Sequence, residues 1–439
     1  MKKAFYIKDS IENKISFYHL LFFLVALPFD RFYSIIILIS FVVHTAIFFK
    51  KNDLRTLTRT TFILQTVFFL TVISALYAPS FSDSSNVIVK QLAIFLFPLL
   101  FAVTSLDLAK YRSRFLLGLT LSCTCTVIYL YYDAIHVLVY NKLPLKELLS
   151  WAFVNHNFSL PIEMHATYLS MLLVICIVFC LEQLFHHQRV SKRIYLAICS
   201  IILTGGLIQL SSKSVLFALL LILTFGFSLF VVSKGNRNRY LFVSVTSSVL
   251  LVSFILSFQV FRERYITKLK DDLYGNHGIV SMNGRFDRWS IALGLIRQSP
   301  ISGTGTGSEV PLLRESYFEH KMYGPYLFSL NAHNQFLSFT INSGAIGLLI
   351  YLAVLGWGFR QSVKHKDIFL FSFILLITVV SFSEDLLDVN KGIFFYAFFF
   401  PFFISTLKKT DSHNSLPMQP PSENSVLYSN RYYVQSEIK

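Results

Sequence analysis

The chain has 439 residues, of which 54% are hydrophobic, 16% aromatic and only 14% charged, and its net charge is +15. Soluble domains carry about 25% charged residues, and here the charges are concentrated between long apolar runs, which excludes an ordinary soluble protein. The positive charge lies in short clusters between those runs, a distribution that argues against nucleic-acid binding.

The apolar runs are each roughly 17–22 residues long, the length that crosses the hydrocarbon core of a bilayer as a helix. We therefore expect an all-α polytopic membrane protein with about 12 transmembrane helices. The first run is short and is followed at once by Asp30-Arg31 and a second run, so it is interpreted as a retained helical hairpin and not as a cleaved signal. The predicted helices are centred near Leu21, Ile39, Phe68, Phe97, Ile128, Leu172, Ile202, Leu220, Leu250, Ile346, Leu375 and Phe399.

The basic residues predict the orientation of these helices. With the N-terminus inside, 24 of the 39 basic residues fall in cytoplasmic segments and 9 in one long outer loop. The short outer loops hold only Arg31, Lys90, Lys142, Lys146, Lys213 and Lys391. By the positive-inside rule, both termini are expected on the cytoplasmic side of the membrane and the long loop on the opposite side.

The long outer loop, at about 262–332, is the largest polar segment within the apolar part of the chain. Its residues Arg285–Arg297 place Trp289, Ala292, Leu293 and Ile296 at helical spacing, which predicts an amphipathic helix. Gly303, Gly305 and Gly307 follow no strand and are therefore expected to form a tight turn and not a nucleotide-binding loop. We expect one integral membrane domain, 1–410, and a disordered cytoplasmic tail, 411–439.

The motif with the clearest chemical meaning begins at the end of this loop, with His333-Asn334 followed nine residues later by Gly344-x-x-Gly347. A histidine with its ordinary pKa near 6.5 can take a proton from a hydroxyl at neutral pH, so His333 is a candidate general base. The alternative is an interfacial histidine that only bonds a neighbour. Gly344 and Gly347 are three residues apart, which predicts one helix face that another helix approaches closely.

Three basic residues are candidates for binding a diphosphate. Arg285 and Arg288 are three residues apart on the predicted loop helix, and two guanidinium groups suit an anion by charge and geometry. A solvated face paired with neighbouring acids is the alternative for that pair. Lys213, in the outer turn Ser211–Ser214, is a third candidate cation, and snorkelling to the interface is its alternative.

Glu384, Asp385 and Asp388 lie together at the predicted outer end of the eleventh span. They could orient His333, bind an acceptor hydroxyl or coordinate a cation, and a solvated helix end is the alternative. Glu163 and His165 are two residues apart before the sixth span, so they are not expected to act as a pair. All five cysteines fall in apolar runs and the chain has no metal-binding motif, so we expect neither a metal nor another cofactor.

On these residues the sequence resembles the O-antigen ligase and O-antigen polymerase family of bacterial membrane glycosyltransferases. The family signature resembles His333-Asn334, nine residues, Gly344-x-x-Gly347. The preceding segment also resembles the family at Arg285, Trp289, Ala292-Leu293, Ile296, Pro300, Gly303, Gly305 and Gly307. The family has Ser-Arg where this chain has Ser212-Lys213, a change that keeps the charge but loses the planar fork.

The resemblance implies a GT-C-like fold and a metal-independent transfer of a glycan from undecaprenyl diphosphate to an acceptor hydroxyl at the periplasmic face. It implies that His333 acts as general base and that Arg285, Arg288 and Lys213 bind the diphosphate. Asn334, Gly344, Gly347 and Glu384 are expected to support the site. A single displacement of this kind inverts the anomeric configuration.

The sequence leaves the acceptor open. Ligation of O-antigen to lipid A–core is the leading hypothesis, and polymerisation of repeat units or O-glycosylation of proteins would use the same donor and motif. A transporter of lipid-linked sugars also fits the predicted number of helices. Transporters carry polar residues near the bilayer midplane and often two related halves, whereas the charges of this chain collect at the predicted outer boundary.

Overall fold

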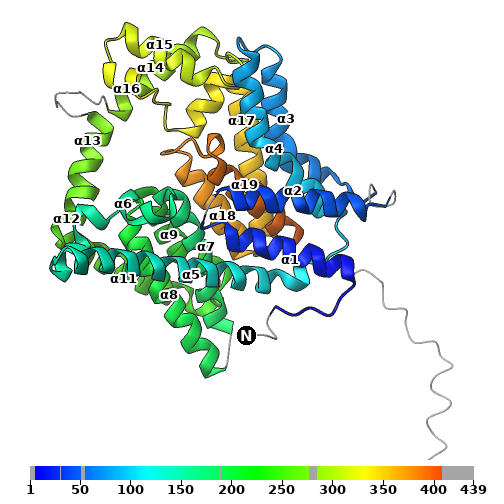
Figure 1. Ribbon diagram of the computed structural model, residues 1–439, viewed down its shortest axis with the longest axis vertical. Helices are drawn as coiled ribbons and strands as arrows, with labels where there is room; N and C mark the ends of the chain where they lie inside the picture. The colour runs from blue at the N-terminus through cyan, green and yellow to red at the C-terminus, as the bar shows by residue number, and fades with distance from the viewer. Residues whose placement is uncertain (1–4, 30, 51–54, 187–188, 276–283, 408–439) are drawn as a thin grey trace, which may run out of the picture. The chain divides into compact units, whose positions relative to one another are not determined.

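The structure is a computed structural model that describes residues 5–29, 31–50, 55–186, 189–275 and 284–407. No strand occurs in those ranges, and every regular element in them is helical (Figure 1). The N-terminal part of the chain forms five helices: α1 (Ile11–Ala26), α2 (Arg31–Ile47), α3 (Arg59–Ala75), α4 (Phe81–Val103) and α5 (Leu108–Tyr140).

Short helical turns lead from α5 into the middle of the chain: η2 (Leu145–Leu149), η3 (Trp151–Phe153), α6 (His156–Ser159) and η4 (Leu160–Ile162). The middle helices are α7 (Ala166–His186), α8 (Val190–Leu210), α9 (Lys213–Leu221), the π-helical turn η5 (Ile222–Gly226), α10 (Phe227–Phe230), η6 (Lys234–Asn236) and α11 (Arg237–Ser257).

The predicted loop is itself helical. It contains α12 (Gln259–Arg262), η7 (Glu263–Thr267), α13 (Lys268–Tyr274), α14 (Arg285–Gln298), α15 (Glu309–Glu319) and α16 (Tyr323–Leu327). The chain then forms α17 (Gln335–His365), α18 (Ile368–Val380), η8 (Leu386–Asp388) and α19 (Asn390–Ser405). The amphipathic helix predicted over 285–297 is confirmed as α14, whereas the predicted tail, 411–439, lies outside the described residues.

Each of the twelve predicted centres lies within a helix, which confirms the helical assignment of all the apolar runs. Among the described residues, 7 helices are long and apolar enough to cross a membrane, judged by length and composition. Three further apolar helices, α2, α3 and α18, are shorter than 18 residues.

The core of the bundle surrounds α7, which packs against α5, α8, α18 and α19. Leu169, Leu173 and Val178 of α7 are fully buried. Aromatic rings fill the space between α18 and α19, where Phe373 stacks on Phe395 with ring centroids 5.6 Å apart. This continuous apolar core holds the turns at the helix ends in fixed positions.

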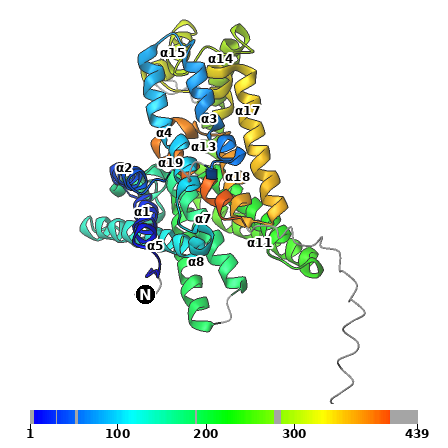
Figure 2. The same cartoon turned by 90° about the vertical axis from the view of Figure 1, so that its right-hand side faces the viewer.

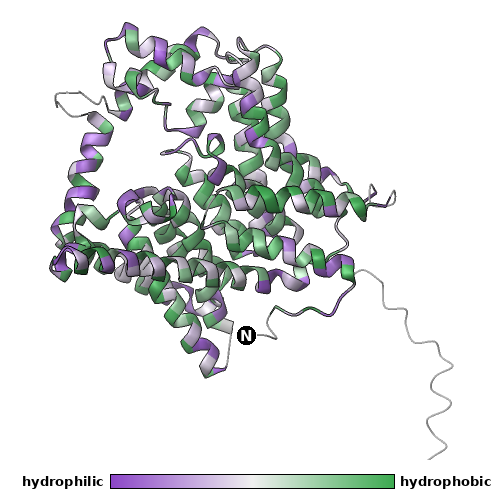
Figure 3. Cartoon of the chain, in the orientation of Figure 1, coloured by the Kyte–Doolittle hydropathy of each residue, from purple (hydrophilic) through white to green (hydrophobic). Residues whose placement is uncertain are grey.

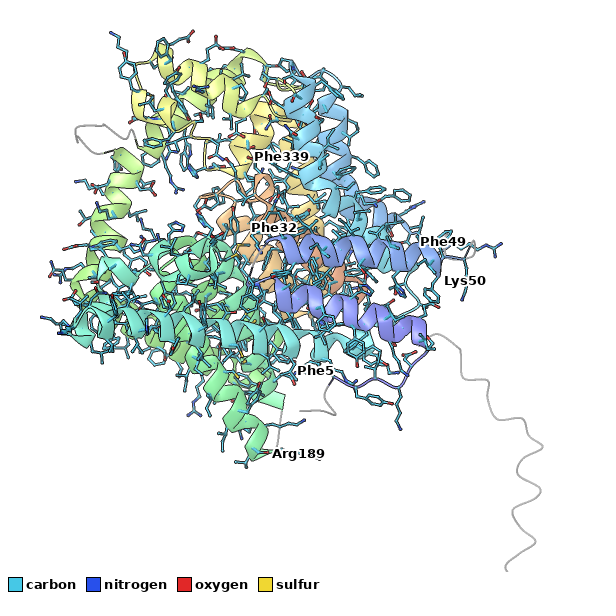
Figure 4. The ribbon with its side chains drawn as sticks, viewed as in Figure 1. Phe5, Phe32, Phe49, Lys50, Arg189 and Phe339 are labelled. Carbon is cyan, nitrogen blue, oxygen red and sulfur yellow. The ribbon has the colours of Figure 1, made fainter. Side chains whose placement is uncertain are left out.

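Several helices have apolar surfaces that are exposed in the chain alone. Figure 3 shows hydrophobic residues along the outer faces of the bundle as well as inside it. On α11 the exposed fractions of Phe242, Leu250 and Phe254 are 74%, 65% and 63%, and Phe32 projects from α2 with 60% exposed (Figure 4). Exposed apolar area of this extent suits contact with lipid.

The element α17 is two helical segments joined at Gly344, whose φ of 63° and ψ of −167° are not helical. The rings of Phe336 and Phe339 lie 5.8 Å and 4.6 Å from the ring of Tyr351, centroid to centroid. In a continuous helix, residues 336 and 351 would be about 22 Å apart along the axis. The chain therefore reverses at Gly344, and the first segment folds back along the second. Figure 2 shows the long helix labelled α17.

The loop after α14 enters this break and satisfies its main-chain groups. The helix loses the bonds from the amides of Ala345 and Ile346 to the carbonyls of Ile341 and Asn342. Four main-chain hydrogen bonds replace them: Thr304 to Ile341 (2.8 Å), Gly305 to Asn342 (2.9 Å), Ala345 to Pro300 (2.9 Å) and Ile346 to Ile301 (3.4 Å). The predicted turn at Gly303–Gly307 is confirmed, and all three glycines have positive φ.

Candidate active site

A polar pocket of about 440 Å³ lies where α7 and α9 begin and α18 ends, which we call the site end of the bundle. Its walls come from segments far apart in the sequence: the turns before α7, the first residues of α7 and α9, the helices α13 and α14, and the residues that follow α18. The bundle holds one side of the pocket and the helical loop holds the other. We call it the cationic pocket, because four basic side chains line it: Lys213, Arg264, Lys268 and Arg285.

Arg285 is fixed at the start of α14 by two contacts. Its Nε donates to Oδ1 of Asp272 at 3.1 Å, and its Nη1 donates to the carbonyl of Ser383 at 2.7 Å. The second contact links the helical loop to the residue that precedes Glu384. Arg285 therefore joins α13, α14 and the segment after α18 at the wall of the pocket.

Lys213 is presented by a strained turn between α8 and α9. Ser211 has a φ of 49° in the left-handed region, which costs free energy unless neighbouring groups hold it. Arg264 holds it, because its Nε lies 3.0 Å from the carbonyl oxygen and 2.9 Å from Oγ of Ser211. The hydroxyl of Ser212 donates to Oγ1 of Thr167 at 3.4 Å, which joins the same turn to the start of α7.

Arg288 does not line the cationic pocket. Its side chain is buried, 5% exposed, and its Nη1 donates to the carbonyl of Asn331 at 3.4 Å. Its Nε has no hydrogen-bond partner among the described residues, and burial lowers the pKa of its guanidinium. The structure thus separates the two arginines: Arg285 faces the pocket, while Arg288 lies behind it against the segment that leads to His333.

His333 lies beside the pocket and reaches it through Glu384. Its Nδ1 is 3.7 Å from Oε2 of Glu384, and the side chain is 33% exposed. Glu384 lines the pocket and also accepts a hydrogen bond from Oγ1 of Thr167 at 3.4 Å. The carboxylate is therefore the group that connects the histidine, the start of α7 and the pocket.

Three side chains hold the backbone around His333, whose φ of 48° is in the left-handed region. The amide of Ala332 donates to Oε1 of Glu309 at 3.1 Å, and that of Asn334 donates to Oδ1 of Asp385 at 3.0 Å. The amide of His333 itself donates to Oδ1 of Asn331 at 3.2 Å. Three consecutive amides are thus held by acceptors from three places, which fixes the backbone of His333.

Asn334 caps the first segment of α17. Its side-chain oxygen accepts from the amides of Phe336 at 3.0 Å and Leu337 at 3.2 Å, the pattern of a helix N-cap. From the other side, Nε1 of Trp289 donates to the carbonyl of Ala332 at 2.9 Å. The amide in the sequence motif therefore serves to start the helix directly after the histidine.

The charge state of the site follows from burial and neighbours. Burial acts to raise the pKa of Glu384, but the contact with His333 and the nearby His165 and Arg285 outweigh it and hold this pKa below its usual value. Burial lowers the pKa of His156 to about 4 and also lowers the pKa of His165. At neutral pH the site therefore combines an ionised carboxylate with two neutral histidines.

Asp385 and Glu309, behind His333, are buried carboxyl groups close to one another. Burial raises the pKa of Glu309 to about 7, and burial together with Glu309 raises that of Asp385. Neither carboxyl group forms a salt bridge among the described residues, and the raised pKa values favour their protonated forms. Their role in the structure is to accept the amides that flank His333.

The glycines of the motif lie away from the histidine and shape the backbone. The prediction that Gly344 and Gly347 share one face of a continuous helix is wrong for Gly344, which is the reversal point of α17. A side chain at Gly344 would overlap the carbonyl of Ile301. Gly347 does lie on the second segment of α17, where an added Cβ would overlap Cβ of Ser343 in the first segment and meet Leu70 of α3 at 3.4 Å.

An apolar pocket of about 420 Å³ adjoins the cationic pocket, and we call it the apolar pocket. It lies between α7, α8, α9 and α11, and leucine and isoleucine side chains form most of its wall. Lys213 and Leu269 line both pockets. A polar pocket and an apolar pocket therefore share part of their wall.

Sequence reasoning missed Arg264, Lys268 and Asp272, which lie in the charged stretch 262–272. Its acids and bases alternate along a short segment, which on the sequence is typical of a solvated face. Only the return of the chain over α9 brings these residues to Lys213. The position of His165 near Glu384 was also missed, since it depends on the packing of α7 against the residues after α18.

No curated protein matches the chain. Residues 197–352, which run from α8 to the second segment of α17, match the model of a family described as O-antigen ligase. That range contains Lys213, Arg264, Arg285, His333 and Gly344, whereas Glu384 lies beyond it. Over residues 197–352 the chain is therefore similar to the O-antigen ligase family, as its sequence motifs indicated.

Proposed function

We propose that the chain is a metal-independent, inverting glycosyltransferase that moves a glycan from undecaprenyl diphosphate to an acceptor hydroxyl, with ligation of O-antigen to lipid A–core as its reaction. The observation that carries the proposal is the pair of adjacent pockets near His333. A cationic pocket suits a diphosphate, and the apolar pocket that shares Lys213 and Leu269 with it suits the adjoining lipid chain.

The reaction needs a base for the acceptor hydroxyl, a carboxylate that stabilises the protonated base, and cations for the leaving diphosphate. The hydroxyl oxygen of the acceptor attacks the anomeric carbon, and the bond from that carbon to the diphosphate oxygen breaks. The hydroxyl proton passes to Nε2 of His333, while Nδ1 faces Glu384, whose negative charge stabilises the imidazolium. The bonding electron pair leaves with undecaprenyl diphosphate, whose growing charge is stabilised by Lys213, Arg264, Lys268 and Arg285.

In this proposal Arg288 does not contact the diphosphate and acts indirectly, through the backbone before His333. It holds the carbonyl of Asn331, and Asn331 in turn accepts the amide of His333. Asn334 and Gly344 shape the helix that follows. Because Glu384 contacts His333, we assign it the role of orienting the histidine. No contact among the described residues supports the alternative that Glu384 coordinates a metal cation.

The proposed topology has twelve spans, with both termini in the cytoplasm of a bacterium and the site end at the periplasmic face of the inner membrane. It is supported by the position of each of the twelve predicted centres within a helix and by the distribution of basic residues. The loop of about 262–332 then stands at the periplasmic side, and its residues Tyr265, Ile266 and Leu269 line the apolar pocket. The alternative of a sugar transporter receives no support from the arrangement, because the polar groups gather at one end of the bundle.

The test is the glycolipid profile of a deletion strain carrying either the wild-type chain or His333→Ala. We expect wild-type lipopolysaccharide to be restored only by the former, with lipid-linked polymer accumulating in the latter at equal protein levels. His320→Ala, an exposed histidine at the end of α15, is the matched control and should restore the wild-type profile.

Full-length lipopolysaccharide in the His333→Ala strain would refute the assignment of the base. A single repeat unit on the core in the deletion strain would instead indicate a polymerase, and loss of glycans from periplasmic proteins would indicate protein glycosylation. Each outcome identifies one acceptor, because the three reactions share the donor.

A further inference from the structure

A second polar pocket, of about 640 Å³, lies at the site end next to the cationic pocket. Its walls come from the turn after α1, from α4, from the turn before α7 and from the start of α19. Its charged and polar lining includes Lys90, Glu163, His165, Asp388, Asn390 and Lys391. Its volume is within the range of about 300–1,000 Å³ that is typical of ligand sites. We call it the balanced pocket.

The two pockets differ in charge. The cationic pocket has four basic and two acidic side chains in its wall, and the balanced pocket has two of each, with Lys90 and Lys391 matched by Glu163 and Asp388. Lys90 Nζ is 3.9 Å from Oδ1 of Asp388, and Lys391 Nζ donates to the carbonyl of Phe29 at 2.6 Å. By its net positive charge the cationic pocket favours a diphosphate, and the balanced pocket does not.

The wall of the balanced pocket instead suits a neutral sugar. Every sugar hydroxyl is both a donor and an acceptor of hydrogen bonds, so a site for sugars needs both kinds of partner. Carboxylates of Glu163 and Asp388 accept, the lysines donate, and the side-chain amide of Asn390 does both. The ring of Tyr168, also in the wall, adds an apolar face.

The position of the pocket relative to His333 supports this reading. His165 lies in the wall of the balanced pocket, and its ring is 4.2 Å, centroid to centroid, from that of His156 in the wall of the cationic pocket. Thr167, two residues after His165, donates to Glu384, the partner of His333. The histidine pair and Glu384 therefore lie between the two pockets, as a reaction centre between two substrates would.

We propose that the balanced pocket binds the sugar of the acceptor that carries the attacking hydroxyl. The proposal rests on the function proposed above and adds the location and chemical class of the second substrate. The donor occupies the cationic and apolar pockets, and the acceptor approaches from the side of His165. The hydroxyl and the anomeric carbon then meet beside His333 and Glu384.

A labelling experiment tests binding separately from catalysis. Glu163→Cys, whose side chain is exposed in the pocket wall, is reacted with a polar maleimide in a Cys125→Ser background, since Cys125 is the exposed cysteine of the described residues. We expect lipid A–core lacking O-antigen to slow the reaction of residue 163, and an undecaprenyl-diphosphate-linked glycan to leave it unchanged. Lys146→Cys, exposed in η2, is the control that neither substrate should protect.

Protection of residue 163 by the donor and not by lipid A–core would overturn the proposal. Equal protection at residues 163 and 146 would do so too, because it would mean adsorption of the glycolipid to the whole surface. Absence of any protection by lipid A–core at saturating concentration is the third refuting result.

Kinetics with the purified full chain provide the second test. We expect Asn390→Ala and Asp388→Asn to raise KM for lipid A–core by about two- to tenfold, the loss of one hydrogen bond, with KM for the donor unchanged. Lys268→Ala in the cationic pocket should show the reverse. If the wild-type chain transfers glycan but the first two variants keep its acceptor KM, the pocket assignment fails alone. If the wild-type chain transfers nothing, the proposed function fails, and labelling still decides whether lipid A–core binds.

Discussion

Replacing Glu384 with glutamine tests the link between the carboxylate and the base with little change in size. Oε2 of Glu384 is 3.7 Å from Nδ1 of His333, and two unit charges at that distance interact by about 4 kcal/mol at an effective dielectric constant of about 20. The imidazole is 33% exposed, and screening by water reduces the figure to about 2 kcal/mol. Because the imidazolium forms only as the hydroxyl proton is transferred, the loss falls on the transition state. We expect kcat to fall about thirtyfold.

The assay is glycan transfer by the purified chain from a lipid-diphosphate donor to lipid A–core, with kcat and both KM values measured. Donor KM should stay near the wild-type value, since the four basic side chains of the cationic pocket are unchanged. Glu315→Gln, an exposed acid of α15, is the matched control and should keep wild-type kcat. A folded Glu384→Gln protein with wild-type kcat would refute the reasoning, because no charge–charge stabilisation of His333 would then be present.

Three further substitutions extend these arguments. Gly344→Ala should lower the free energy of unfolding by more than about 2 kcal/mol, because φ 63° with ψ −167° is accessible essentially only to glycine and Ile301 blocks a Cβ. Gly356→Ala, on the same helix with open space around it, should not destabilise the protein. Equal melting temperatures for the two variants would contradict the reversal. Burial raises the pKa of Glu309 to about 7 from an ordinary value of 4.5, so the folded state keeps a proton that the unfolded state loses, and stability falls as pH rises between those values. Glu309→Gln should remove this slope in thermal unfolding between pH 4.5 and 7. An unchanged slope would show that Glu309 is not its source. Lys213→Ala should raise KM for the donor by about tenfold. Lys213→Arg should not, because arginine keeps the charge and supplies a planar guanidinium fork. Equal KM values for the two variants would exclude Lys213 as a diphosphate ligand.

The helices of this protein could be predicted from its sequence because their apolar runs are long and their signal is local. The twelve predicted centres all lie in helices, and α14 extends from Arg285 to Gln298 where 285–297 was predicted. Hydropathy and helical spacing depend only on neighbouring residues, so tertiary contacts were not needed for either result.

The site was only partly predictable, because its geometry depends on contacts between distant segments. Arg285 and Arg288 look equivalent in sequence, yet one faces the cationic pocket and the other is buried against Asn331. The reversal at Gly344 had a glycine as its only sequence signal, and a glycine also suits close helix packing. Glu384 was chosen as a supporting residue, but its distance from His333 depends on where α18 ends and where α17 begins.

The reversal of α17 has a consequence for the competition between transfer and hydrolysis. The first segment contains nine residues from Gln335 to Ser343, so His333 lies about 13 Å back from the turn, alongside the second segment. In the proposed topology the base therefore lies on the bilayer side of the turn, below the helical loop, where lipid-anchored substrates are concentrated and water is scarce. The anomeric carbon should then react with a sugar hydroxyl in preference to water. Release of free glycan from the donor in the absence of acceptor should accordingly be much slower than transfer, and a comparable rate would show that the site is open to bulk solvent.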